Sequence, residues 1–104
     1  MARLGARLLA GGGWRGARRV GIRDAWLAPE RYADMIIAVV GEVRAFEAGT
    51  PGVYYTLDEG AARIGLRGDA LSSWVGQRVR VSGKLTFKPG VGIFLDAERI
   101  AAAR

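Results

Sequence analysis

The apolar residues between positions 35 and 100 follow two different periods, and this order constrains the fold more than any other feature of the sequence. Most of the region alternates apolar and polar residues, which is the pattern of a β-strand with one buried face. The alternation breaks once, in residues 68–76. There Leu71, Trp74 and Val75 are spaced i, i+3, i+4, as on one face of a helix.

Glycine and proline divide the alternating region into five expected strands. Asp69 is a candidate N-cap for the short helix and Gly76 a candidate stop. Gly41 and Gly83 mark a bend or bulge within the two longest strands. The expected strands are residues 35–47, 53–58, 62–67, 77–88 and 93–100.

Three strands, a short helix and two more strands are the order of an OB-type barrel. The predicted fold is therefore all-β, a five-stranded OB-type barrel whose helix, between the third and fourth strands, plugs the bottom. Trp74 would anchor that plug in the core. A small SH3-like barrel is the main rival, but it has no helix at this point.

The first 34 residues differ in composition from the rest. They hold seven arginines against three acidic residues, a net charge of +4, whereas residues 35–104 carry only +2. We interpret residues 1–34 as a basic N-terminal extension, flexible or partly helical with Asp24 as a possible N-cap, and residues 35–104 as the OB-fold domain. Met35 is an alternative translation start. The extension favours an anionic partner, but a solvated tail explains it equally well.

Composition argues against several functional classes. The chain has no cysteine and no histidine, which removes disulfides, thiol nucleophiles, the common zinc sites and the usual general base. The carboxylates are better explained by strand faces and a helix cap than by catalysis. No apolar run approaches the ~20 residues that span a bilayer. We expect a cytoplasmic protein that is not an enzyme and has no cofactor, no metal site and no membrane partner.

Four short segments of the expected strands form a recognisable set. They are Gly41-Glu42-Val43, Tyr54-Tyr55-Thr56-Leu57, Gly60-Ala61-Ala62-Arg63-Ile64 and Val79-Arg80-Val81-Ser82-Gly83-Lys84. Through these segments residues 39–100 resemble the anticodon-binding-like OB folds, most of all the OB domain of the exodeoxyribonuclease VII large subunit. The resemblance implies a single-stranded-DNA-binding face and no nuclease. Asp58 departs from the family pattern, which tends to place a lysine there, and this removes a phosphate contact.

Two adjacent tyrosines in the second strand suggest a binding face, because neighbouring strand residues point to opposite sides. If Leu57 points inward, then Val53 and Tyr55 do too, while Tyr54 and Thr56 point outward. OB barrels commonly bind oligonucleotides over the second and third strands. The outward candidates are Tyr54, Thr56, Arg63 and Arg67, extended by Arg44, Lys88 and Phe94.

These residue types suit single-stranded nucleic acid, since aromatic rings stack on bases and arginines track phosphates. We therefore predict non-catalytic binding of single-stranded DNA or RNA with low sequence preference, Tyr54 and Phe94 stacking the bases. An outward tyrosine could equally be a cross-strand packing partner. The alternative function is an OB-fold protein-interaction subunit of a larger complex.

Overall fold

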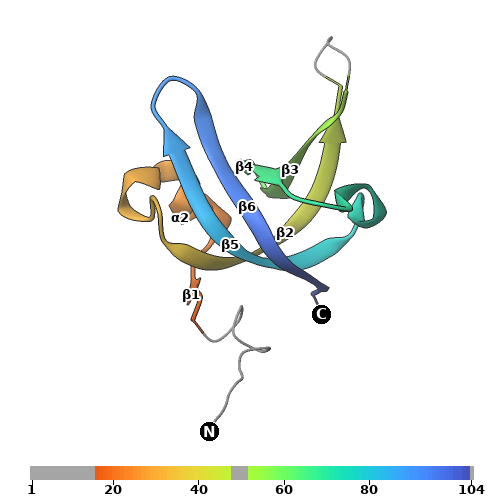
Figure 1. The fold of residues 1–104 in the computed structure, drawn as a ribbon, viewed down its shortest axis with the longest axis horizontal. Coiled ribbons are helices and arrows are strands. Elements are labelled where there is room, and N and C mark those ends of the chain that lie inside the picture. The colour runs from red at the N-terminus through yellow and green to blue at the C-terminus, as the bar shows by residue number, and fades with distance from the viewer. Residues whose placement is uncertain (1–15, 48–51, 104) are drawn as a thin grey trace, which may run out of the picture.

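Strands and a few short helical pieces make up the chain in the computed structural model, which describes residues 16–47 and 52–103 (Figure 1). The first part holds strand β1 (Arg18–Arg19), helix α2 (Ile22–Leu27) and the 3-10 turn η1 (Pro29–Arg31). The remaining elements are β2 (Ile36–Phe46), β3 (Tyr54–Glu59), β4 (Ala62–Arg67), the 3-10 turn η2 (Leu71–Trp74), β5 (Arg78–Lys88) and β6 (Gly92–Ala102).

Five of the strands form a closed ring of pairings. The sheet order is β1-β2-β3-β4-β6-β5, and β2 also pairs with β5. The long strand β2 makes this closure possible, because it pairs with β5 over residues 36–42 and with β3 over residues 42–46. The β4–β6 pairing is parallel, and the other pairings within the ring are antiparallel. In Figure 1 the β2–β3 and β5–β6 hairpins rise on opposite sides of β4.

The core fills the inside of the ring, because alternate residues of every strand point inward. Each fully buried Val, Leu or Ile side chain contributes about 1.5–3 kcal/mol by leaving water. Tyr55 and Trp74 are half-buried and pack against this cluster, as the sequence predicts for both. The fully buried side chains include Ile37, Val39, Val43, Leu57, Ile64, Val79, Val81, Leu85 and Leu95.

The helix lies elsewhere than predicted. The α-helix, α2, precedes the ring, and its Ile22 and Ala25 are buried in the core shared with the strands. Gly41 of β2 makes room for it, because a Cβ there would collide with Cδ1 of Ile22. The piece between β4 and β5 is only the 3-10 turn η2, with Ala70 left-handed at its N-cap and no side-chain cap. Neither Asp24 nor Asp69 caps a helix, and Gly21 is the N-cap of α2.

Strand number and some side-chain directions also differ from the expectation. Six strands are present among the described residues, because β1 adds a parallel strand to β2 in the region predicted as extension. Val53, expected inside, is 49% exposed because it precedes the first residue of β3. Ser82 is buried beside the bulge between Ser82 and Gly83, although the alternation from the inward Val79 and Val81 would place it outside, and the bulge confirms the predicted bend at Gly83. The predicted boundary at residue 34 stays a prediction.

None of the helices within residues 16–47 and 52–103 is long and apolar enough to cross a bilayer.

Candidate functional site

One row of paired residues runs across the outside of the ring. Arg44 pairs with Thr56, Thr56 with Gly65, Gly65 with Phe94, and Phe94 with Thr86. These five positions come from β2, β3, β4, β6 and β5, and their side chains share one face because register partners point the same way. We call this surface, with the alternate residues on either side of the row, the outer face.

Tyr54 stands at one end of the outer face in a group of five side chains. Its ring stacks on that of Phe46, its register partner, with centroids 5.6 Å apart. The guanidinium of Arg63 lies over the same Phe46 ring, 4.5 Å from the centroid. Asp58 Oδ2 accepts hydrogen bonds from Arg63 Nε at 3.0 Å and Nη2 at 2.9 Å, while Oδ1 accepts one from the Thr56 hydroxyl at 2.7 Å.

A second group of the same kind forms around Phe94. The guanidinium of Arg67 lies 4.5 Å from the Phe94 ring centroid. Asp96 accepts hydrogen bonds from Arg67 Nε at 2.8 Å and Nη2 at 3.1 Å, and one from the Thr86 hydroxyl at 2.8 Å. Gly65 lies under the edge of this ring, since a Cβ there would be 2.6 Å from Phe94 Cδ1.

These contacts shift the ionisation of the charged groups. The hydrogen bonds from Arg67 hold the pKa of Asp96 below its usual range, with a smaller contribution from Thr86 in the same direction. The hydrogen bond to Asp58 raises the pKa of Arg63. Each of these two shifts favours the charged form of its group, the carboxylate of Asp96 and the guanidinium of Arg63.

An open pocket of about 360 Å³ lies between strands β3 and β4, the start of β6 and the loop that joins β5 to β6, and it is lined in part by outer-face residues. The loop contributes Val91, which is largely exposed. Aromatic rings, arginine stems and apolar side chains make the pocket suited to a flat ligand with an apolar surface. The lining residues are Tyr54, Tyr55, Thr56, Arg63, Gly65, Leu66, Arg67, Val91, Gly92, Ile93 and Phe94.

The pocket brings together most of the site residues predicted from the sequence. Tyr54, Thr56, Arg63, Arg67 and Phe94 line it, with Tyr54 half-exposed as expected. Thr56 differs, because it is on the predicted face but only 4% exposed. The other two predicted residues lie outside the lining. Arg44 is exposed next to its register partner Thr56, and its Nη1 lies 3.7 Å from Oε2 of Glu42. Lys88 is exposed at the end of β5 and is the register partner of Gly92.

Sequence reasoning missed several residues that complete these groups. Phe46 could have been found, since strict alternation from the buried Val43 places it on the outer face with Arg44. The sequence predicts for Asp58 only the loss of a phosphate contact, whereas in the structure its carboxylate accepts two hydrogen bonds from Arg63. Asp96 and Thr86 could not have been connected to Arg67, because their contacts depend on the parallel β4–β6 pairing.

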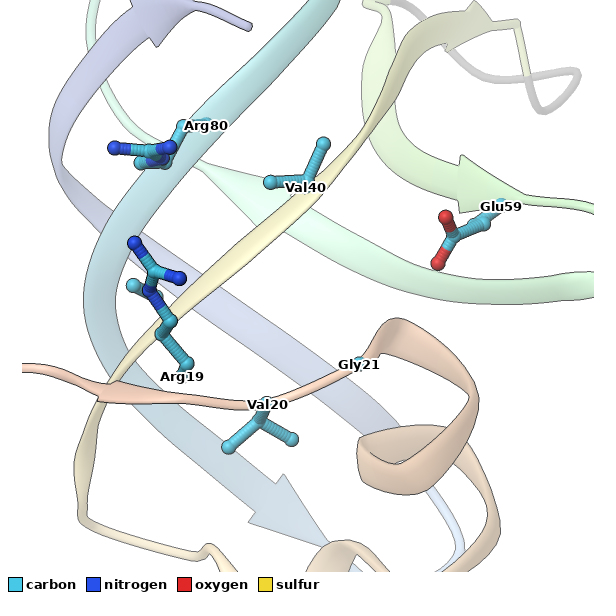
Figure 2. A pocket seen from close by; sticks show the side chains of 7 residues that line it. Arg19, Val20, Gly21, Val40, Glu59 and Arg80 are labelled. Carbon is cyan, nitrogen blue, oxygen red and sulfur yellow. The ribbon is translucent and has the colours of Figure 1, made fainter.

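A separate pocket of about 310 Å³ lies beside β1. Figure 2 shows Arg19 and Arg80 on one side of Val40 and Glu59 on the other. Glu59 accepts a hydrogen bond from Arg78 at 3.3 Å. None of the site residues predicted from the sequence lines this pocket. Among the described residues no group of three or more acidic side chains is placed to hold a metal ion.

Comparison with known proteins gives a fold but no family. No protein-family model matches the chain, and no curated protein matches it. Solved structures do match. The S. pombe Stn1–Ten1 complex is 15% identical with a TM-score of 0.58, covering 84% of this chain and 76% of that one. The hypothetical protein ygiW from E. coli is 14% identical with a TM-score of 0.59, covering 84% of this chain and 91% of that one.

A third solved structure is similar over more of this chain but belongs to a much larger protein. A putative aspartyl-tRNA synthetase from Leishmania major is 13% identical with a TM-score of 0.56, covering 93% of this chain and 23% of that one. All three are OB-fold proteins, so the likeness supports an all-β, OB-like fold for this chain. The narrower resemblance to exodeoxyribonuclease VII stays a prediction.

Proposed function

We propose that this protein binds single-stranded nucleic acid on its outer face, with low sequence preference and without catalysis. The observation that carries the proposal is the exposed Tyr54 ring, stacked on Phe46 at the rim of a pocket that also holds Phe94, Arg63 and Arg67. An aromatic surface flanked by arginines binds unpaired bases, because every base has a flat face that stacks.

The aromatic groups would supply most of the affinity, and the charged groups at the margin would hold the backbone. Stacking on an aromatic ring contributes about 1–3 kcal/mol per base and depends little on which base is stacked. Arg44 and Lys88 are exposed at the margin of the pocket, where a phosphate could approach them. The OB-fold neighbours, which include the telomere capping protein Ten1 and an aminoacyl-tRNA synthetase, support a nucleic-acid partner by analogy only.

The absence of catalysis belongs to the proposal. The two acidic side chains next to the pocket, Asp58 and Asp96, are already engaged by an arginine and a threonine each. In Asp96 this pairing lowers the pKa of the carboxyl, which leaves it poorly suited to exchange protons near neutral pH. We also propose, from the sequence, that the protein works in the cytoplasm.

Binding of a fluorescent oligonucleotide by the parent and by Tyr54→Ala tests the proposal. We expect the parent to bind at low salt and Tyr54→Ala to bind roughly 5- to 100-fold more weakly, the loss of one stacked base. Trp26→Ala is the matched control, since Trp26 is an exposed aromatic residue outside the pocket. Equal binding by parent and Tyr54→Ala would remove the outer face as the site.

A specific feature favours the alternative, a protein-interaction subunit. Trp26 and Leu27 are 43% and 62% exposed on α2, and Trp26 lines a further pocket with Arg23 and Gly60. Exposed large apolar side chains beside a pocket are typical of protein interfaces. One structural neighbour is the complex of Stn1 with Ten1, which agrees with this reading by analogy.

Salt distinguishes the two functions. Nucleic-acid binding weakens between about 50 and 200 mM salt, because counterions are released when phosphates are neutralised. Light scattering and affinity capture, repeated with Trp26→Ala, would detect a protein partner. A captured partner whose binding resists salt and is lost in Trp26→Ala would favour the alternative.

A further inference from the structure

The two arginines of the outer face are held by the same arrangement twice, although no sequence repeat relates the two groups. In each group the carboxylate of an aspartate accepts hydrogen bonds from Nε and Nη2 of the arginine, at 2.8–3.1 Å. In each a threonine donates to the same aspartate at 2.7–2.8 Å. In each the guanidinium carbon lies 4.5 Å from a phenylalanine centroid. The groups are Thr56–Asp58–Arg63–Phe46 and Thr86–Asp96–Arg67–Phe94.

This arrangement occupies one edge by which an arginine can bind phosphate. The Nε and Nη2 edge is one of the donor pairs that chelate a carboxylate or phosphate. In Arg63 and Arg67 that edge is taken by the aspartate, and the charge of each pair sums to zero. The two arginine side chains stay 50% and 46% exposed, each with its guanidinium above an aromatic ring. Guanidinium planes stack on bases as aromatic rings do.

We propose that Arg63 and Arg67 bind unstacked nucleobases through their flat faces and do not hold phosphates. Asp58 and Asp96 are then positioning residues that keep the two planes in place. This inference rests on the proposed function and names the part of the nucleic acid that the site recognises.

The use of two planes defines the kind of strand that can bind. Arg63 and Arg67 are four residues apart on β4, so their Cα atoms are about 13 Å apart at ~3.3 Å per residue and each plane receives a different base. A base that stacks on a guanidinium must be splayed out of its own base stack. The ligand at these two positions is therefore single-stranded.

A pair of oligonucleotides with equal charge tests the inference. One is a thymidine oligomer of about 12 nucleotides, within the site size of OB folds, and the other is an abasic strand of the same length. We expect the parent to bind the thymidine oligomer at least about tenfold more tightly, because only this ligand has bases to stack.

Arg67→Lys keeps the positive charge but loses the plane. We expect its affinity for the thymidine oligomer to fall roughly 5- to 100-fold. Its affinity for the abasic strand and the slope of log affinity against log salt should stay unchanged.

Asp96→Asn should instead change the salt dependence. The substitution frees the charge of Arg67 to bind phosphate and should steepen that slope by about 0.7 per phosphate gained. Thr86→Val loosens Asp96 without changing charge and should weaken thymidine binding alone.

One result would overturn the inference and spare the proposed function: an Arg67→Lys variant that binds both strands as the parent does. Equal binding of the thymidine and abasic strands by the parent would overturn the inference together with the stacking role proposed for Tyr54. Absence of binding to either strand would instead refute the proposed function itself. Thermal unfolding of each variant separates lost binding from lost fold, and Asp96→Asn adds a gain of salt dependence that misfolding cannot produce.

Discussion

Gly65 of β4 and Phe94 of β6 are register partners, and the glycine leaves the space into which the edge of the phenylalanine ring fits. The parallel pairing of two strands thus also determines where one aromatic side of the pocket lies. Gly65 has no left-handed backbone that would require glycine, so contact with the ring is the physical reason for the missing side chain.

Gly65→Ala should therefore disturb both stability and the pocket. Its Cβ would be 2.6 Å from Phe94 Cδ1 and 3.1 Å from the Ile93 carbonyl oxygen, so the ring must move. Overpacking of this kind costs about 1–3 kcal/mol, which urea unfolding would measure. Gly21→Ala is the control, because its nearest contact is an ordinary 3.4 Å from Asp24. A Gly65→Ala variant as stable as the parent would contradict the contact.

Ile22→Ala should destabilise the protein as a core substitution does. Ile22 is fully buried among the ring strands although it belongs to the N-terminal helix α2. Truncating a buried isoleucine to alanine costs about 2–5 kcal/mol. Leu27→Ala, on the exposed side of the same helix, should change stability by less than about 0.5 kcal/mol.

Truncation also tests the packing of α2 against the ring strands. Removing residues 1–34 should lower the melting temperature far more than removing residues 1–15, since only the longer deletion takes Val20, Ile22 and Ala25 from the core. Equal melting temperatures for the two truncations would show that the ring is stable without α2.

Stability in acid should depend on Asp96. Its pKa is lowered by Arg67 in the folded protein, so its ion pair stabilises the fold above the ordinary value of 3.8. That contribution is lost as the pH falls through the lower, folded value. Asp96 is 42% exposed, so we expect less than about 1 kcal/mol. Urea unfolding at neutral pH and at about pH 3 should show a smaller loss in Asp96→Asn than in the parent.

Ser82→Ala should be neutral or slightly stabilising. The Ser82 hydroxyl is buried and makes no hydrogen bond among the described residues. Burying a hydroxyl without a hydrogen-bond partner costs desolvation free energy, so removing it should raise the free energy of unfolding by about 1–3 kcal/mol at most. Thr56→Val is the contrasting variant, since Thr56 is equally buried but donates to Asp58 at 2.7 Å, and its loss should destabilise by about 1 kcal/mol. A destabilised Ser82→Ala would show that the hydroxyl has a partner.

Alternation in the sequence was enough to locate the five ring strands and the face of Tyr54, because a strand with one buried side leaves a clear period of two. It could not predict α2 as part of the core, since two buried residues in six, Ile22 and Ala25, are too few for a helical period. It also misjudged Thr56, because a residue on the outer face can be covered by its neighbours. The groupings around Arg63 and Arg67 depend on tertiary distances that a sequence does not contain.

The closed ring has a consequence for folding during synthesis. Strand β6 occupies residues 92–102 and completes the ring by pairing with both β4 and β5. Until the ribosome has released those residues, β4 lacks its parallel partner and Leu66 lacks the neighbour Leu95 that it meets in the sheet. Non-local pairings of this kind form late and slowly. The outer-face pocket is therefore built only when β6 pairs with β4, and the ion pair that holds Arg67 exists only from that point on.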